Sequence, residues 1–156
     1  MKSTVYIETT IPSFYYETRT DAECVAMRDW TRRWWDKRKD SYKCFISIAV
    51  LDELENGDYP KKEEKISLIS GIDYLEINDE IEEIVEVYIA NYLMPQDVVG
   101  DALHLAIASF HKVDYLLTWN CNHLANASKK KYIRRINGRL RLSTPEIITP
   151  LEIMEE

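Results

Sequence analysis

The feature that most constrains the fold is a regular alternation of strand-like and helical segments along the 156 residues. Short runs rich in β-branched and aromatic residues cover 3–7, 42–48, 73–77, 113–118 and 140–148. Helical periodicity covers 13–17, 21–39, 49–58, 61–70, 79–92 and 100–109, and a further short helix is expected from 120. Strands separated by helices pair in parallel. The sequence therefore predicts one α/β domain over 1–156, an α/β/α sandwich with a mainly parallel central sheet.

Composition narrows the class of protein. The chain is 46% hydrophobic and 30% charged, which suits a globular domain of about 150 residues. No apolar run approaches the roughly 18 residues of a membrane span, and the N-terminus lacks a signal-peptide pattern. The three cysteines have no CxxC spacing, which argues against a disulfide framework or a zinc site. We expect a reduced protein of the cytoplasm with no membrane partner.

Two segments concentrate positive charge in a chain whose net charge is −7. Ser128–Arg141 holds seven Lys and Arg residues and no acid, and it is either an RNA-backbone contact or a solvated helix face. Asp21–Lys39 interleaves Trp30, Trp34 and Trp35 with basic residues. That pattern is typical of core packing with a charged rim, and its alternatives are an RNA-stacking surface or a partner interface.

The stretch Gly100–Ser109, GDALHLAIAS, predicts an amphipathic helix with a carboxylate near its start. Leu103, Ala106, Ile107 and Phe110 recur at helical spacing and are expected to face the core. Asp101 lies in the first turn, where the helix dipole favours a negative charge. The helix therefore presents one acid at the margin of an apolar surface.

Two further acids and one amide follow the predicted strands. Glu8 follows the first strand, Glu53 lies on the helix after the second, and Asn120 follows the strand 113–118. Asp52 is the fallback for Glu53. The carboxyl ends of parallel strands meet at one edge, so these residues and Asp101 are expected to converge. Clustered carboxylates suit Mg²⁺ or Mn²⁺, which would activate water against a phosphodiester.

Four motifs in this order, VYIETTIPSFY, ISIAVLDELENGD, GDALHLAIAS and YLLTWNCNHLAN, resemble the PIN-domain family, in particular the VapC-like toxins of bacterial toxin–antitoxin pairs. The resemblance covers essentially the whole chain. It implies an α/β/α sandwich, a divalent-metal site of three or four acids and cleavage of single-stranded RNA. It also implies a homodimer and a cognate antitoxin protein as partners.

Carried over by position, the resemblance makes Glu8, Glu53 and Asp101 the metal ligands. Asn120 stands where a fourth acid is expected, and Thr9 where a hydroxyl usually follows the first acid. Glu8 stands where the family usually has Asp, and its side chain is one methylene group longer, so a metal ion must occupy a different position. Asn120 offers no charge, which favours a site with one metal. The four residues Glu8, Glu53, Asp101 and Asn120 are thus the predicted catalytic set.

Other polar residues flank this set. The predicted substrate contacts are Thr9, Thr118, Asn122 and His123. His104 is interpreted as a hydrogen-bonded core histidine, with contact to the pocket as the alternative. Asp97 is a candidate supporting acid, four residues before Asp101.

Three functions of different classes fit these observations. The first is a Mg²⁺- or Mn²⁺-dependent endoribonuclease, the toxin of a type II toxin–antitoxin pair. The second is a catalytically impaired PIN-like module that binds RNA or a protein, which the departures at Glu8 and Asn120 favour. The third is a receiver-like phospho-switch. It ranks below the others because the strand ends offer Glu8 and Asn120 where a phosphoacceptor Asp is needed.

Overall fold

The computed structural model describes residues 1–93 and 99–154. One five-stranded sheet has the order β3-β2-β1-β4-β5, and every pairing is parallel. Its strands are β1 (Thr4–Ile7), β2 (Lys43–Ile46), β3 (Asp73–Tyr74), β4 (Tyr115–Leu117) and β5 (Glu146–Ile148). The predicted α/β fold with a parallel central sheet is confirmed.

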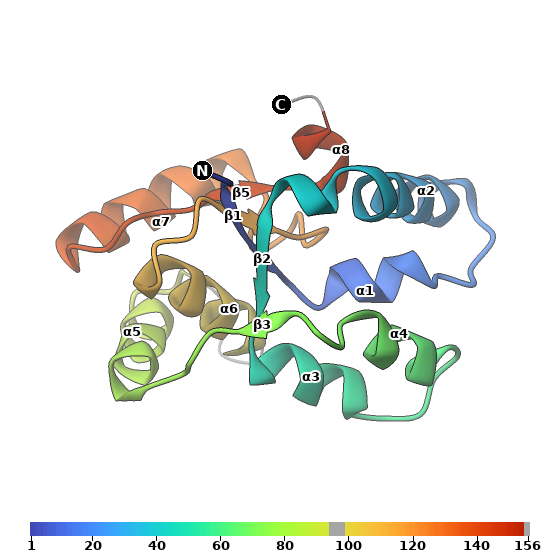
Figure 1. Ribbon diagram of the computed structural model, residues 1–156. Helices are drawn as coiled ribbons and strands as arrows, with labels where there is room; N and C mark the ends of the chain where they lie inside the picture. The colour runs from blue at the N-terminus through green and yellow to red at the C-terminus, as the bar shows by residue number, and fades with distance from the viewer. Residues whose placement is uncertain (94–98, 155–156) are drawn as a thin grey trace.

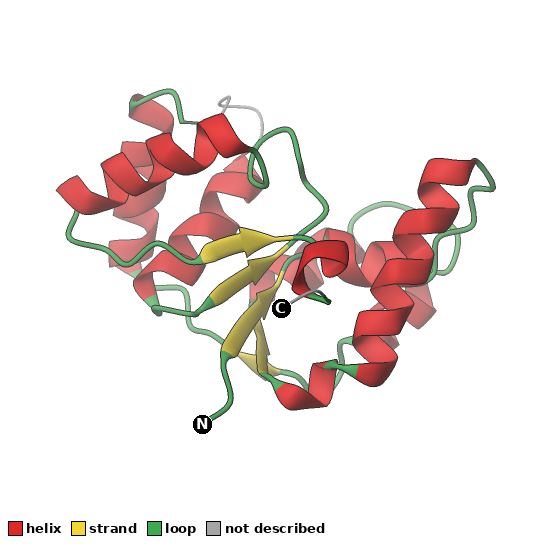
Figure 2. Cartoon of the chain, turned by 90° about the horizontal axis from the view of Figure 1, so that it is seen from above, coloured by secondary structure: helices red, strands yellow, loops and turns green. Residues whose placement is uncertain are grey.

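Helices cover both faces of the sheet (Figures 1 and 2). One layer contains α5 (Asp79–Ala90), α6 (Val99–Phe110) and α7 (Ala127–Arg139). The other contains α1 (Thr10–Tyr15), α2 (Ala22–Lys37), α4 (Lys62–Leu68) and α8 (Pro150–Ile153). A short 3₁₀ turn, η1 (Lys39–Ser41), leads into β2, and α3 (Ile48–Glu55) follows β2 and contacts both α4 and α6. This arrangement is the predicted α/β/α sandwich.

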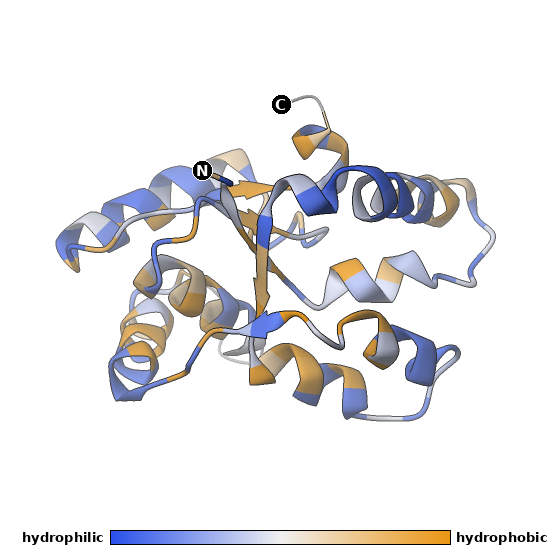
Figure 3. Cartoon of the chain, in the orientation of Figure 1, coloured by the Kyte–Doolittle hydropathy of each residue, from blue (hydrophilic) through white to orange (hydrophobic). Residues whose placement is uncertain are grey.

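The central strands are apolar because both of their faces are covered. Val5, Tyr6 and Ile7 of β1 are fully buried, as are Leu116 and Leu117 of β4. Figure 3 shows these strands as hydrophobic, whereas the outer helix α7 is largely hydrophilic. The core therefore lies along the middle of the sheet and ends where polar residues follow β1 and β4.

Helix α6 is buried more completely than an amphipathic surface helix. Ala106 and Ile107 are buried as predicted, but His104 and Ser109 on the same helix are buried too. Leu103 and Phe110 are partly exposed but pack against the core, so the predicted core-facing stripe is confirmed. The cause is that α6 packs against α5 and also contacts α3 and β4, so most of its circumference is covered. A histidine is thereby brought into the core.

Several short elements differ from the prediction. Helix α1 begins at Thr10 rather than Ser13, with Pro12 in the first turn, where its missing N–H is not needed. Residues 121–124 form turns and no helix, although the Asn120 Oδ1 atom accepts a hydrogen bond from the His123 N–H at 3.1 Å, as an N-cap residue does. Helix α8 was not predicted, because four residues show no periodicity; its capping box joins Thr149 and Glu152.

The length and composition of a helix determine whether it could cross a membrane. Helix α2 has 16 residues and carries charged side chains along its length. Within 1–93 and 99–154, no helix is both long and apolar enough to cross a bilayer.

Replacement of Asn137 tests the packing of α7 against α5 and α6. This side chain is fully buried, accepts from the Tyr88 hydroxyl at 2.5 Å, and donates to Ser109 Oγ and Thr144 Oγ1, each at 3.1 Å. Asn137→Ala leaves these partners unsatisfied, so we expect a loss of about 1–3 kcal/mol in the free energy of unfolding. Urea denaturation measures it. Asn56→Ala, at an exposed position, is the control; equal effects of the two variants would contradict this account.

Candidate active site at the carboxyl edge of the sheet

The polar site lies where the chain changes direction within the sheet. From β1 the chain builds β2 and β3 on one side, and it then returns to place β4 and β5 on the other. Open α/β sheets bind ligands outside the carboxyl ends of the strands at such a switch point. Glu8 follows β1 and Thr118 follows β4, and the Glu8 N–H donates to the Leu117 carbonyl at 3.1 Å.

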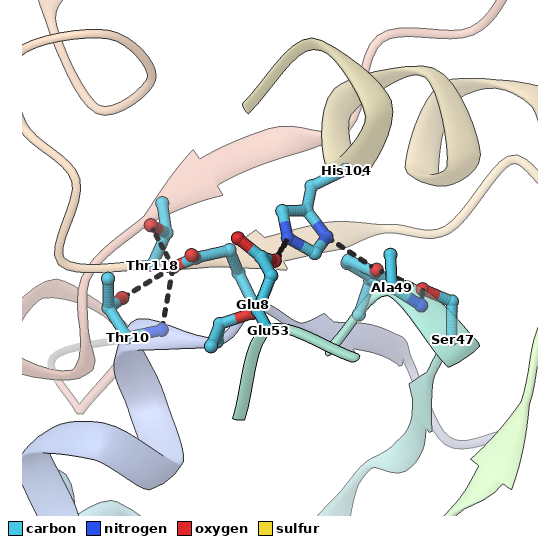
Figure 4. A network of polar contacts seen from close by, with 9 residues as sticks. Glu8, Thr10, Ser47, Ala49, Glu53, His104 and Thr118 are labelled. Carbon is cyan, nitrogen blue, oxygen red and sulfur yellow. Dashed lines mark hydrogen bonds and ion pairs between the residues drawn. The ribbon is translucent and has the colours of Figure 1, made fainter. Parts of the chain in front are cut away.

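Glu8 is a buried carboxylate held by the hydroxyl groups of Thr10, at the start of α1, and Thr118, after β4 (Figure 4). Its side chain is almost fully buried, with 3% of the residue exposed. One oxygen, Oε1, accepts from the Thr10 N–H at 3.1 Å, the Thr10 hydroxyl at 2.5 Å and the Thr118 hydroxyl at 2.7 Å. Burial raises the pKa of Glu8, and the charge of His104 and these hydrogen bonds oppose that rise.

The same two hydroxyls fix the loop after β4. The Thr10 hydroxyl accepts from the Trp119 N–H, and the Thr118 hydroxyl accepts from the Asn120 N–H, each at 2.9 Å. Glu8 thus orients both threonines and, through them, the backbone of the following turn. Glu8 therefore links the two segments that follow β1 and β4, beyond the point where the strands themselves pair.

Glu53 faces the same edge from α3, which begins after Ser47, the residue that caps it. The Glu53 side chain is 44% exposed, so the expectation of a buried carboxylate is wrong, whereas Val50 and Leu54 on the same helix are buried as predicted. Its Oε1 atom accepts from the Thr9 hydroxyl at 2.8 Å and pairs with His104 Nε2. Partial burial favours a higher pKa for Glu53, but the hydrogen bond and charge of His104 outweigh it and lower the pKa.

His104 lies at the centre of the cluster and is fully buried. Burial alone would lower the pKa of His104, but the hydrogen bond to Glu53 and the charges of Glu8, Glu53 and Asp101 raise it. The other ring nitrogen, Nδ1, lies 2.7 Å from the Tyr6 hydroxyl, which lies 2.7 Å from Ser47 Oγ. A protonated ring donates to both Glu53 and Tyr6, and the Tyr6 hydroxyl then donates to Ser47.

Asp101 joins this cluster from the first turn of α6. Its side chain is half-buried, and burial raises the pKa of Asp101. A hydrogen bond with Asn120 and the charges of His123 and His104 oppose this rise. The negative charge of Glu53 adds to it. The start of α6 also lies against Glu53, because a Cβ atom on Gly100 would be 3.1 Å from Glu53 Oε2. The absence of a side chain at Gly100 therefore leaves room for the Glu53 carboxylate beside Asp101.

The structure brings together most of the residues singled out in the sequence. Glu8, Glu53 and Asp101 surround His104, and Asn120 and His123 adjoin Asp101. The remaining predicted residues have other surroundings. The Thr9 hydroxyl donates to Glu53, and the buried Thr118 hydroxyl donates to Glu8. Asn122 and Asp52 are exposed. Asp97 lies outside the described residues.

Sequence reasoning missed three supporting residues. Thr10 supplies two hydrogen bonds to Glu8, and Tyr6 and Ser47 hold the far side of the His104 ring. Tyr6 had a usable signal, because residues two apart on a strand share a face and Tyr6 precedes Glu8 by two. His104 is the hydrogen-bonded core histidine that the sequence predicted, and it also contacts the site.

The donor set does not form a ready-made cage for a metal ion. In the part of the chain that the structure describes, no three His, Cys, Asp or Glu residues are grouped so that they could hold one. Mg²⁺ is usually held by one or two carboxylates, with water and substrate phosphate completing its shell. Glu53 and Asp101 are partly exposed and electrostatically coupled, so they suit a site of that kind.

Comparison of the sequence with protein-family models and with curated proteins gave no match. Membership of the PIN-domain family stays a prediction from four sequence motifs. An α/β/α sandwich hosts many functions, so the function must be argued from the site.

Gly100→Ala tests the contact between α6 and Glu53. The added Cβ would meet Glu53 Oε2 at 3.1 Å, so the carboxylate must move and its bond to His104 must weaken. We expect the free energy of unfolding to change by less than about 1 kcal/mol, because helix propensity and crowding oppose each other. NMR titration should show a lower His104 pKa; an unchanged pKa would mean that the carboxylate has not moved.

Glu53→Gln tests the charge of the pair through pH. The pKa of His104 is raised, so its contribution to stability is present below its ordinary value of 6.5 and is lost as pH rises through the folded value. The pKa of Glu53 is lowered, so its contribution is present above 4.5 and is lost as pH falls through its folded value.

The stability lost in Glu53→Gln should therefore be largest between the two ordinary values and smaller on either side. Because Glu53 is 44% exposed, solvent screening limits the loss to about 1 kcal/mol. Thermal denaturation across this pH range measures it, with Glu55→Gln, an exposed acid of the same helix, as the control. A loss independent of pH would argue against a charged pair.

Proposed function

We propose that the protein is a divalent-cation-dependent endoribonuclease that cuts single-stranded RNA at the carboxyl edge of its sheet. One observation carries the proposal: three carboxylates from three separate segments, Glu8, Glu53 and Asp101, act on one buried imidazole, His104. Burial and mutual repulsion make such a group of acids a favourable place for a cation. The four family-like motifs in the sequence support RNA as the substrate.

Each residue has a distinct part in the proposed reaction. Glu53 and Asp101 would hold Mg²⁺ or Mn²⁺, which supplies an activated water and stabilises charge on the phosphate. His104 holds Glu53 by one oxygen, and Asn120 and His123 oppose the rise that burial causes in the pKa of Asp101. Both effects favour the ionised form of the two carboxylates, which is the form that binds a cation.

Glu8 serves mainly as a support in this proposal. Its Oε1 atom already accepts three hydrogen bonds, so it stabilises the threonines under the site. A direct bond from Glu8 to the ion, as the family pattern implies, would have to use its other oxygen. Loss of Mn²⁺ binding in Glu8→Gln would identify it as a ligand, whereas retained binding would identify it as a support.

The toxin interpretation extends the proposal to partners and location. It includes a cognate antitoxin protein, a homodimer and residence in the cytoplasm. The three cysteines support a reducing compartment, since all are free thiols and Cys121 is exposed.

A non-catalytic module that binds RNA or a protein is the second candidate. One observation favours it: the described acids form no three-ligand metal group, and His104 already pairs with Glu53. On this interpretation the charge cluster only stabilises the edge of the sheet. RNA bound tightly but left intact in Mg²⁺ and in Mn²⁺ would select this candidate.

Asp101→Asn provides the direct test of catalysis. With its charge removed, we expect cleavage of single-stranded RNA in Mn²⁺ to fall at least about a hundredfold, since a charged ligand at the reacting phosphate contributes several kcal/mol. Gel analysis of end-labelled RNA measures the rate, and EDTA should abolish it. The matched control Glu55→Gln should cut at the wild-type rate. Cleavage that persists in Asp101→Asn would refute this site as the reaction centre.

A further inference from the structure

A groove of about 450 Å³ lies between α2 and the turn that follows β4. Its walls include the indole rings of Trp30 and Trp119, and its rim includes Glu23, Ala26 and Asn122. Both tryptophans are partly exposed and line the groove, so part of each ring is accessible to a ligand. The groove is thus an aromatic-lined site outside the cluster of acids.

The two indoles are held in place. The Trp119 Nε1–H donates to the Thr31 hydroxyl at 2.7 Å, and the Phe14 ring lies 6.3 Å from Trp119 between centroids. The Arg33 guanidinium lies 4.9 Å from the centre of the Trp30 ring, so it covers one face of that ring. Rigid aromatic faces next to a guanidinium are the elements that bind single-stranded nucleic acid, by stacking of bases and attraction of phosphates.

The rim of the groove offers hydrogen bonds to the edge of a base. The Asn122 side chain is exposed and makes no hydrogen bond within 1–93 and 99–154, so its donor and acceptor atoms are available. Glu23 adds an oxygen that only accepts. The oxygens of Asn122 and Glu23 could accept hydrogen bonds from the exocyclic amino group of adenine or cytosine. Uracil has no such amino group, so it fits this rim less well.

The groove connects directly to the proposed reaction centre. The Trp119 N–H donates to the Thr10 hydroxyl at 2.9 Å, and that hydroxyl donates to Glu8 at 2.5 Å. A base stacked on Trp119 would therefore lie on the residue that follows Thr118, whose hydroxyl group donates to Glu8. The basic helix α7, by contrast, contributes Lys130 and Arg134 to a pocket of only about 60 Å³ without an aromatic residue.

We propose that the groove between Trp30 and Trp119 binds one amino-bearing nucleobase of the RNA strand that is cut at the acidic cluster. This inference rests on the proposed endoribonuclease function. It assigns to Asn122 a contact with the base edge and to Arg33 a contact with the adjoining phosphate. A peptide in the groove is the competing occupant, which the experiment below distinguishes.

The test is fluorescence anisotropy with a fluorescein-labelled 2′-O-methyl oligoadenylate, which resists cleavage, in EDTA. Ala26→Trp fills the groove from an exposed helix position, and Trp30→Ala removes one wall. We expect each to weaken binding about tenfold, the usual range for loss of one stacked base. Tyr92→Ala removes an exposed aromatic outside the groove and should bind as the wild type does. Oligouridylate should bind more weakly than oligoadenylate.

Three results would overturn the assignment: no binding by the wild type, wild-type affinity in Ala26→Trp, or equal affinity for the two oligonucleotides. Wild-type affinity in Ala26→Trp with loss in Arg134→Ala would place the RNA on α7 and leave the groove to a peptide. The variants fold correctly if their thermal midpoints match that of Tyr92→Ala.

Cleavage assays separate this inference from the function on which it rests. If cleavage is lost in Asp101→Asn but unchanged in Ala26→Trp, the proposal that the groove binds a base is overturned and the proposed nuclease function stands. Binding lost in Ala26→Trp without cleavage by the wild type would uphold the groove and overturn the nuclease.

Discussion

The site depends on one buried imidazole that lies among three acids. His104 is enclosed by the sheet and by α3, and the acids around it raise its pKa although burial opposes that rise. Protonated, the ring neutralises part of the charge of Glu53, Glu8 and Asp101 and thereby lets three carboxylates share one edge. A cation that enters the cluster would compete with the protonated form of this ring, so its binding would favour release of the proton.

The buried carboxylate of Glu8 gives this edge its shape. By accepting from Thr10 and Thr118, it joins the loop after β1 to the turn after β4, two segments 110 residues apart. The same hydroxyls accept from the backbone of Trp119 and Asn120. One buried acid therefore supports the acidic cluster and also fixes the backbone of Trp119 in the aromatic groove, so it would position the proposed base binding and phosphate chemistry together.

The sequence predicted the architecture well because the strands are apolar runs that a covered parallel sheet requires. It also predicted that Glu8, Glu53 and Asp101 would converge, because the carboxyl ends of parallel strands meet at one edge. It could not show that Glu53 is half-exposed. Helical spacing gives the direction of a side chain, but not which other residues pack over it. Nor could it show that Thr10 rather than Thr9 holds Glu8, which depends on where α1 begins. The sequence did predict His104 as a core histidine, but it could not show that the buried ring pairs with Glu53, because that contact depends on how α3 lies against α6.

The most direct test of the central claim is an NMR titration of the His104 imidazole with and without Mg²⁺. If the acids and His104 form one electrostatic unit that accepts a cation, Mg²⁺ on Glu53 and Asp101 repels the imidazolium and lowers the pKa of His104. The shift should disappear in Asp101→Asn. A His104 pKa that is the same with and without Mg²⁺, at a concentration that supports RNA cleavage, would contradict the account.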